Sequence, residues 1–369
     1  MKLTVDRKLF HKAFSAAAAA TPSGSPKPIL KCVKLEASQE FSRLTLTGTD
    51  LEVGVRINCV AGVEESGATL LPVDRIAAIL RNSDDDMLAI EATKDGVTIK
   101  GERSQFKLPT MPAEVFPLVA TFKADSYYEI LGRGFRSALD RTLYAIDTES
   151  SRYALGGVLF EFVNKTAFFI GCDGRRLAKT QWPVERIGDP EAQTEPTVVI
   201  PEAAKLMRKA FTDDETLKIA VSANDVIVAG ETATIYSRLV EGRYPKWRDV
   251  VPQRRDATRV EFGVEPLLRA IKQASIVATE ESSGVDFRME KGRLTLAAQS
   301  ADVGASEVEL PIAFDGELAI TLKPRYVADF LSVVEDETIT IEIKDEKSAA
   351  VCRTSDGYEY VIMPLSRDR

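Results

Sequence analysis

The chain has 369 residues, of which 44% are hydrophobic, and a formal net charge of −8. A chain of this length and composition can bury a core in each of several domains. No apolar run reaches the roughly 18 residues of a membrane-spanning helix. The Ala16 to Ala20 run lies in a helix that begins with charged residues, so we expect no signal peptide. These features predict a cytoplasmic protein that does not interact with membranes.

The first part of the chain predicts a unit that recurs later. A short strand and an amphipathic helix are expected in LTVDRKLFHKAFSAAA, where apolar residues recur at spacings of three and four. Alternating strands follow in LTLTGTDLEVGVRINCV, a pattern typical of antiparallel sheets with one buried face. A helix opened by Pro72, an acidic turn and a strand pair complete the unit in LPVDRIAAILRNSDDDMLAIEATKDGVTIKG.

The same order of elements appears twice more. The strand and helix recur in YYEILGRGFRSALDRTL and RVEFGVEPLLRAIKQASIV. The proline-led helices recur at Pro201 and Pro324, so the copies are 201 − 72 = 129 and 324 − 201 = 123 residues apart. That period is the length of a domain rather than of a solenoid repeat. We therefore predict an α+β fold of three similar domains, each with two helices packed on antiparallel sheets, at residues 1–124, 125–255 and 256–369.

The sequence contains few residues suited to catalysis. His11 is the single histidine, which rules out most histidine-based acid–base or metal sites. Gly132 and Gly134 lack the spacing of a dinucleotide-binding loop, and no phosphate-binding loop is present, so we expect no cofactor. The four cysteines are scattered and have no partner histidines, which predicts reduced core thiols. They are Cys32, Cys59, Cys172 and Cys352.

Three acidic clusters follow the proline-led helices. They are Asp84 to Asp86, Asp213 to Glu215 and Glu335 to Glu337. Clustered carboxylates can hold two catalytic metals. Their recurrence at the same place in all three copies favours solvated turns over a metal site.

The predicted helices carry a repeated basic face. Lys8 and Lys12 lie opposite Leu9 and Phe14 in the first helix, and similar faces are expected in the other domains. Sorting of positive charge onto helices in an acidic chain suits sequence-independent contact with a polyanion such as duplex DNA. No base-reading module is evident. The helix residues expected to face DNA are Lys8, Lys12, Arg75, Arg133, Arg136, Lys205, Arg208, Lys209, Arg269 and Lys272.

Several motifs resemble one known family along the whole chain. These are LTGTDLE, RYALGGVLFEF, CDGRRLA, LVEGRYPKWRDVVP and the terminal YVIMPL. They are similar, in order, to the bacterial sliding clamps, the beta subunits of DNA polymerase III. The resemblance implies a DNA clamp fold in which two three-domain subunits pair head to tail into a ring, with the helices lining the central hole. It also implies a non-catalytic processivity factor in DNA replication.

The resemblance implies further contact residues. In the dimer interface it suggests Phe106 and Leu108 against Ile276 and Val277, which ordinary core packing would also explain. Loop residues Arg152 and Tyr153 match family positions that touch DNA. Lys27 lies in the family's other DNA-facing loop, where Gly24 replaces a frequent basic residue.

A pocket for client peptides is also implied. In this family the clients dock an extended segment, often with a Gln at one end and a Leu-Phe pair at the other. Arg175 stands where a His is familiar, and the chain continues past the pocket as Ser366 to Arg369. A tight Asp-Gly hairpin turn in CDGRRLA would form one wall. The pocket residues would be Leu155, Cys172, Gly174, Arg175, Arg176, Leu177, Pro245, Val250, Tyr326, Val351, Val361, Ile362, Met363, Pro364 and Leu365.

The partners implied by the family are a second copy of the chain, double-stranded DNA, the DNA polymerase III alpha subunit and an ATP-driven clamp loader. Other polymerases and mismatch-repair or ligase-type clients would use the same pocket. A metal-dependent nuclease would need a nonrepeated carboxylate cluster, which the sequence lacks. A protein scaffold that does not bind DNA would not be expected to concentrate Lys and Arg on the repeated helices.

Overall fold

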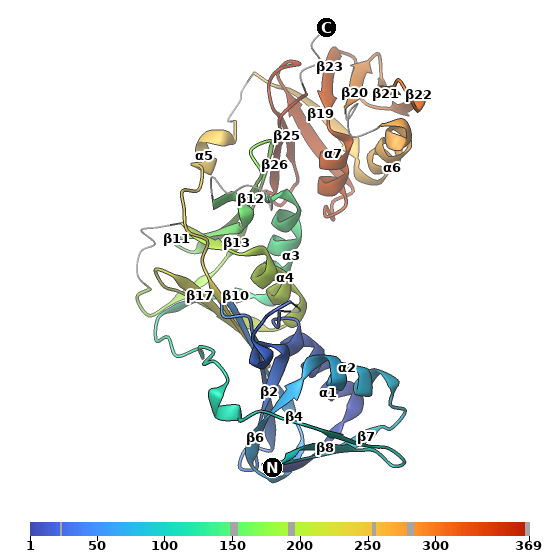
Figure 1. The fold of residues 1–369 in the computed structure, drawn as a ribbon. Helices are drawn as coiled ribbons and strands as arrows, with labels where there is room; N and C mark the ends of the chain where they lie inside the picture. Colours follow the sequence, from blue (N-terminus) through green and yellow to red (C-terminus); the bar gives the residue numbers. More distant parts are fainter. Residues whose placement is uncertain (23, 148–153, 191–195, 253–255, 279–283, 366–369) are drawn as a thin grey trace. The chain divides into compact units, whose positions relative to one another are not determined.

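The computed structural model describes residues 1–22, 24–147, 154–190, 196–252, 256–278 and 284–365 (Figure 1). Arg152, Tyr153 and the tail from Ser366 to Arg369 lie outside these residues. The chain divides into two compact units. The first contains Met1–Arg136 and Val184–Val240, and the second contains Ser137–Pro183 and Glu241–Arg369. The domain boundaries expected from the sequence remain a prediction.

The secondary structure follows the predicted threefold order. The first copy contains β1 Lys2–Asp6, α1 Arg7–Ala18, β2 Cys32–Ser38, β3 Arg43–Thr49, β4 Val53–Val60, β5 Gly62–Glu65, β6 Gly67–Pro72, α2 Val73–Asn82, β7 Met87–Thr93, β8 Gly96–Lys100 and β9 Gln105–Leu108. The second contains β10 Tyr127–Leu131, α3 Gly132–Thr142, β11 Val158–Val163, β12 Thr166–Cys172, β13 Arg176–Pro183, β14 Glu185–Ile187, β15 Thr197–Val199, α4 Pro201–Ala210, β16 Thr216–Val221, β17 Asp225–Ala229 and β18 Ala233–Arg238.

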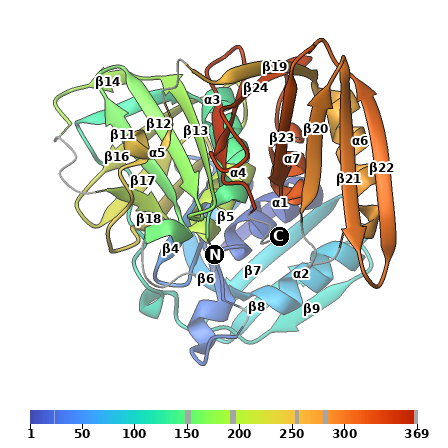
Figure 2. The same cartoon turned by 90° about the horizontal axis from the view of Figure 1, so that it is seen from above.

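The third copy follows a short helix, α5 Trp247–Val250. It contains β19 Thr258–Gly263, α6 Val264–Ala274, β20 Val285–Glu290, β21 Arg293–Ser300, β22 Gly304–Pro311, β23 Glu317–Leu322, α7 Pro324–Leu331, β24 Thr338–Ile343, β25 Ala350–Arg353 and β26 Glu359–Ile362. Helices α6 and α7 pack against each other, as Figures 1 and 2 show, and α6 also contacts β21 and β22. The expectation of two helices packed on antiparallel strands in each copy is confirmed.

The predicted helix starts have identifiable sequence signals. Pro201 and Pro324 open α4 and α7, where the missing proline N–H costs no helical hydrogen bond. Pro72 is the cap residue just before α2. Helix α1 begins after Asp6, whose carboxylate accepts a hydrogen bond from the Leu9 N–H at 2.8 Å.

One helix expectation was wrong. The buried stripe of α1 consists of Phe10, Ala13, Phe14 and Ala17, whereas Leu9 is 62% exposed. Leu9 lies about a quarter turn from this stripe at 3.6 residues per turn, so its side chain leaves the core. Phe10, rather than Leu9, lies on the side of α1 opposite Lys8 and Lys12.

Two sheets join strands from consecutive copies. In the first unit the strand order is β14-β10-β16-β17-β18-β4-β3-β2-β6, and β18 of the second copy pairs with β4 of the first. In the second unit β11, β12, β13, β26, β25, β24 and β19 are successive neighbours, and β26 of the third copy pairs with β13 of the second. Each pairing satisfies two strand edges that would otherwise be open.

The acidic turns are hydrogen-bonded structural elements, and the expectation of a solvated turn was wrong for Glu215, whose side chain is buried. In each copy, one carboxylate of the turn accepts the backbone N–H of the loop that closes the last strand pair. The pairs are Asp85 with Glu102 at 3.0 Å, Glu215 with Glu231 at 2.8 Å and Asp336 with Ser355 at 2.8 Å. Among the described residues, no three His, Cys, Asp or Glu side chains are arranged to hold a metal ion. The same residues include no helix long and apolar enough to cross a membrane.

Glu215 should therefore contribute to stability. Its buried carboxylate accepts hydrogen bonds from the backbone N–H groups of Thr212 at 2.6 Å and Glu231 at 2.8 Å. Replacing Glu215 with Ala should lower the unfolding free energy by about 2 kcal/mol, because two donors lose their acceptor. Denaturant unfolding measures this loss. Exposed Asp214→Ala is the matched control, and equal stability of the two variants would contradict the structural role.

Candidate functional site

The hairpin between β12 and β13 forms the tight turn predicted from CDGRRLA. The Asp173 carboxylate accepts the N–H groups of Arg175 at 2.9 Å and Arg176 at 2.8 Å. Gly174 has φ +81, a conformation that favours glycine over residues with a side chain. Cys172 and Leu177 face each other across the strands that this turn connects. The predicted hairpin is therefore confirmed.

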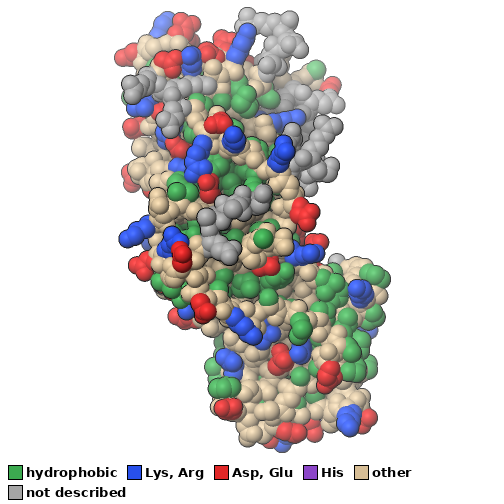
Figure 3. Space-filling view, turned by 90° about the vertical axis from the view of Figure 1, so that its left-hand side faces the viewer, with side chains coloured by type: hydrophobic (Ala, Val, Ile, Leu, Met, Phe, Trp, Pro, Cys, Tyr) green, Lys and Arg blue, Asp and Glu red, His purple; other side chains and the backbone are tan. Residues whose placement is uncertain are grey.

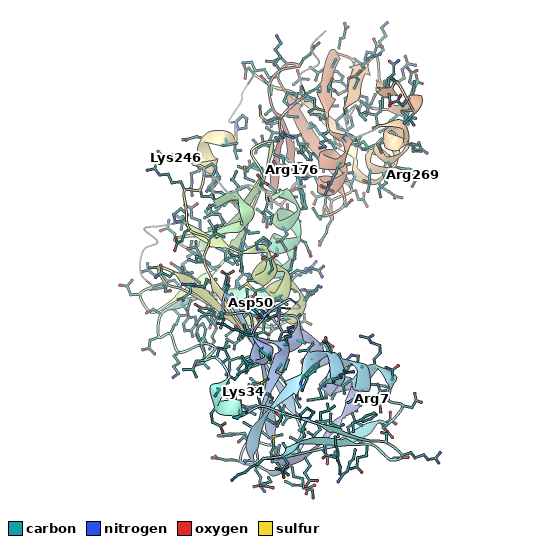
Figure 4. All side chains as sticks on the ribbon, in the orientation of Figure 1. Arg7, Lys34, Asp50, Arg176, Lys246 and Arg269 are labelled. Atoms are coloured by element: carbon teal, nitrogen blue, oxygen red, sulfur yellow. The ribbon has the colours of Figure 1, made fainter. Side chains whose placement is uncertain are left out.

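Arg176 anchors the start of β13. Its side chain, labelled in Figure 4, is buried and pairs with Asp173 at 2.9 Å and with Asp329 of α7 at 2.7 Å. It also donates to the Tyr144 carbonyl oxygen, and its guanidinium carbon lies 4.3 Å from the ring centre of Tyr326. Burial alone would lower the pKa of Arg176, but Tyr360, Asp329 and Asp173 raise that pKa above its ordinary value. Arg176 therefore stays charged.

Four predicted pocket residues form one apolar row across four neighbouring strands. Cys172 pairs with Leu177, Leu177 with Val361 and Val361 with Val351. Paired residues lie on the same face of a sheet. This face is opposite the one that packs on α6 and α7, since the core there uses the alternate residues such as Ala178 and Ile362. Ile362 and Tyr326 belong to that core and support the pocket from behind.

Other pocket residues reach the same area from loops. The Met363 N–H donates to the Arg175 carbonyl at 2.9 Å, which places the C-terminal segment beside the hairpin turn. Met363 is 48% exposed and Val250, in α5, is 41% exposed. The Leu365 N–H donates to the Thr321 carbonyl at 2.9 Å.

The connector before α5 is fixed against the same sheet. The Tyr244 hydroxyl donates to the Ile170 carbonyl at 3.1 Å, just before Pro245. The Ala154 N–H donates to the Arg243 carbonyl at 3.3 Å, which brings buried Leu155 next to this connector. Accessible members of the predicted pocket are thus Met363, Val250, Gly174 and Arg175, with Pro245, Pro364 and Leu365 half-buried.

A polar cavity of about 1320 Å³ lies beside the apolar row. Phe168, Lys179, Trp247 and Arg353 are among its lining residues, none of which we identified from the sequence. Lys179 follows Leu177 by two residues on the same strand face. This alternation could have revealed the cavity if the pairing of β13 with β26 had been known.

The basic helix residues differ in accessibility. Arg136 and Arg208 are half-buried, and Arg136 pairs with Asp213 and donates to the Arg208 carbonyl at 3.2 Å. Arg269, labelled in Figure 4, is 69% exposed and pairs with Glu265 at 2.6 Å. Figure 3 shows Lys and Arg interspersed with Asp and Glu on the face that it displays. The exposed residues of the predicted set are Lys8, Lys12, Lys27, Arg75, Arg133, Lys205, Lys209, Arg269 and Lys272.

The predicted interface residues lie near open sheet edges. Phe106, 36% exposed, and half-buried Leu108 are on β9, the edge of the order β5-β1-β7-β8-β9. Ile276 is 75% exposed and half-buried Val277 follows it in a short 3₁₀ helix next to β22, the edge of the order β22-β21-β20-β23. Phe106 and Ile276 are therefore not ordinary core residues.

Comparison with known families gives matches along almost the whole chain. Residues 1–120, 129–246 and 248–366 match the N-terminal, central and C-terminal domain models of the DNA polymerase III beta subunit. A beta sliding clamp of Chlamydia muridarum is 27% identical over 367 residues, which cover 99% of each chain. One from Haemophilus influenzae is 28% identical over 347 residues, which cover 92% of each.

Solved structures give the same result for the fold. The DnaN sliding clamp of Pseudomonas aeruginosa bound to griselimycin superposes with a TM-score of 0.91 at 25% identity, with complete coverage of both chains. A DNA polymerase sliding clamp from Bacillus subtilis has a TM-score of 0.90 at 20% identity, covering 100% of this chain and 99% of that one. The second likeness concerns the fold alone.

Arg176 allows a test of how the hairpin wall is held. Replacing Arg176 with Leu should lower the unfolding free energy by about 3 kcal/mol, because Asp173 and Asp329 lose their buried cation. Neighbouring Arg175→Leu, at an exposed position, should change stability by less than about 0.5 kcal/mol. Chemical denaturation of both variants measures the difference. A stability loss shared equally by both would show that Arg176 does not anchor the turn.

Proposed function

Because the chain belongs to the DNA polymerase III beta subunit family, whose members are sliding clamps, we propose that two copies close head to tail around duplex DNA and tether DNA polymerase through the pocket beside the β12–β13 hairpin. A sliding clamp is a non-catalytic processivity factor, so binding and geometry are its whole function. The observation that carries the proposal is the match of all three domain models, in order, along the chain. We also propose the domain limits 1–124, 125–255 and 256–369.

The pattern of strand pairing supports ring closure. Strands β9, β18 and β26 end their copies, and β4, β13 and β22 precede the second half of each copy. Within the chain, β18 pairs with β4 and β26 pairs with β13. The equivalent pair that is left is β9 with β22, both at sheet edges. A heterologous β9–β22 contact between two copies, made twice, would close a ring of six domains.

The side chains at these edges suit such a contact. Phe106 and Leu108 would cover Ile276 and Val277, which removes exposed apolar surface from water. Lys107 on β9 and Glu307 on β22 are both exposed and carry opposite charges. Complementary charge favours the heterologous pairing over contact between two like edges.

The exposed helix lysines and arginines would form the DNA-facing wall. Such groups attract phosphates without reading bases, and the attraction weakens as salt rises. Lys27 would add a contact from its exposed loop, and Arg152 and Tyr153 are proposed from the family pattern alone. Arg136 and Arg208 would contribute less to phosphate binding, since both side chains are half-buried. Weak contacts distributed over many residues permit sliding, while the closed ring prevents release.

We propose the polymerase III alpha subunit as the principal client, with other polymerases and mismatch-repair or ligase-type proteins competing for the pocket. Accessible Met363 and Val250 would contact the apolar end of the docking segment, as anchors in peptide-binding grooves do. Tethering raises the local concentration of the polymerase at the primer end. An ATP-driven clamp loader is proposed to open and load the ring.

Encirclement predicts retention that depends on DNA topology. Once loaded, the protein should remain on nicked circular DNA and be lost when the circle is linearised, because a ring can slide off an end. Gel filtration of labelled protein with each DNA measures retention. Phe106→Asp, which places a charge in the β9 edge, should give monomers that stay on neither DNA. Equal retention of the unaltered protein on both forms would refute encirclement.

The client pocket predicts a separate effect on peptide affinity. Replacing Met363 and Leu365 together with Ala should weaken binding of a peptide with a Gln at one end and Leu-Phe at the other by about tenfold, because apolar anchor contacts are lost. Fluorescence anisotropy measures affinity, and sedimentation verifies that the dimer persists. Val163→Ala, at an exposed position outside the pocket, is the control. Unchanged affinity in the double variant would mean that the pocket is elsewhere.

A further inference from the structure

The polar cavity runs alongside the apolar row of the client pocket. On three adjacent strands, a pocket residue is followed or preceded two positions away by a charged residue on the same face. The three pairs are Leu177 with Lys179, Val361 with Glu359 and Val351 with Arg353. Residues two apart on a strand are about 7 Å apart. The apolar row and the charged row are therefore parallel and adjacent.

The carboxylate of the charged row, Glu359, and that of neighbouring Glu342 are paired with three cations. Glu342 accepts Arg259 at 3.0 Å and Arg353 at 3.3 Å. Glu359 pairs with Arg353 and also accepts Lys179 at 3.3 Å. Three positive side chains thus share two carboxylates, and Lys179 is at the end of this chain of ion pairs.

Further positive charge lies close to Lys179. The Lys179 ammonium lies 5.7 Å from the ring centre of Phe168, and the Arg248 guanidinium lies 5.5 Å from the same ring. Arg248 has its own partner in Glu161 at 2.8 Å. Burial lowers the pKa of Lys179, and repulsion by Arg353 and Arg248 lowers it further. An additional carboxylate at this point would relieve that repulsion.

The other end of the cavity is different. Asp336 and Glu337 are among its lining residues there, and Asp336 already accepts the Ser355 N–H at 2.8 Å. Lys179, Arg353 and Arg248 lie at the end of the cavity next to the apolar row, where the lining carboxylates Glu359 and Glu342 are already paired with cations.

We propose that this end of the cavity binds acidic side chains that flank the docking motif of a client peptide, so that the clamp selects clients by charge as well as by their apolar anchor. This inference rests on the client pocket proposed above. An extended peptide advances about 3.3 Å per residue, so a carboxylate two or three residues beyond the anchor would reach Lys179. The partner is thus an acidic extension of the same peptide.

Two synthetic peptides test the proposal on the full chain. Both contain the Gln and Leu-Phe motif, and each end carries three Asp residues in one peptide and three Asn residues in the other. Fluorescence anisotropy should show about threefold to tenfold tighter binding of the Asp peptide at low salt, the range expected for partly buried ion pairs. The advantage should shrink as salt rises.

Lys179→Met should abolish the advantage of the Asp peptide and leave the affinity for the Asn peptide unchanged. Glu359 keeps Arg353 as its partner in this variant. Lys165→Met, which removes the same charge at an exposed position outside the cavity lining, should retain the advantage. Thermal unfolding verifies that both variants fold, and the comparison of the two peptides on the unaltered protein needs no variant.

The outcomes separate this inference from the proposed function. Equal binding of the two peptides to the unaltered protein, or an Asp advantage that survives Lys179→Met, would overturn the charged extension while leaving the client pocket intact. If neither peptide binds, the client pocket fails and the inference fails with it.

Discussion

The pairing of β13 with β26 is the constraint on which the proposed client site depends. It places Leu177 opposite Val361 and Lys179 opposite Glu359, residues that are far apart in the chain. A slip of one residue would turn every side chain of one strand to the other face and destroy both rows. The site therefore depends on register as much as on residue type. The same kind of junction, β18 with β4, joins the first two copies. Strand pairing between copies therefore both joins the copies and, at β13 and β26, brings the residues of the proposed client site together.

Arg176 explains why this register is well defined. Buried ion pairs seldom stabilise a fold more than apolar packing would, because desolvation opposes their attraction. Buried ion pairs nevertheless require a specific geometry. Arg176 must reach Asp173 in its own turn and Asp329 in α7 at the same time, which fixes the end of β13 relative to the third copy. The charged side chain thus specifies one arrangement where apolar residues alone would tolerate several.

The sequence predicted the local features well and the contacts between copies poorly. Proline-led helices, the Asp-Gly turn and the acidic loops depend on neighbouring residues, and they appear where expected. Leu9 was misplaced because helical spacing leaves the border of a buried stripe undefined. The polar cavity was missed because Lys179 and Arg353 come together only through strand pairing. The ion pair of Arg136 with Asp213 likewise depends on tertiary packing that a charge pattern does not reveal.

The threefold repeat leaves different strand edges open in the first and third copies. In a chain of three copies, two junctions are made internally and one β9-type edge and one β22-type edge are left. In the third copy the last strand continues directly into Met363 and Leu365, beside the hairpin of the second copy. A connector occupies the corresponding place after the first copy. The proposed client pocket therefore depends on the segment that follows the last strand of the third copy, and the proposed ring of two such chains would carry two pockets.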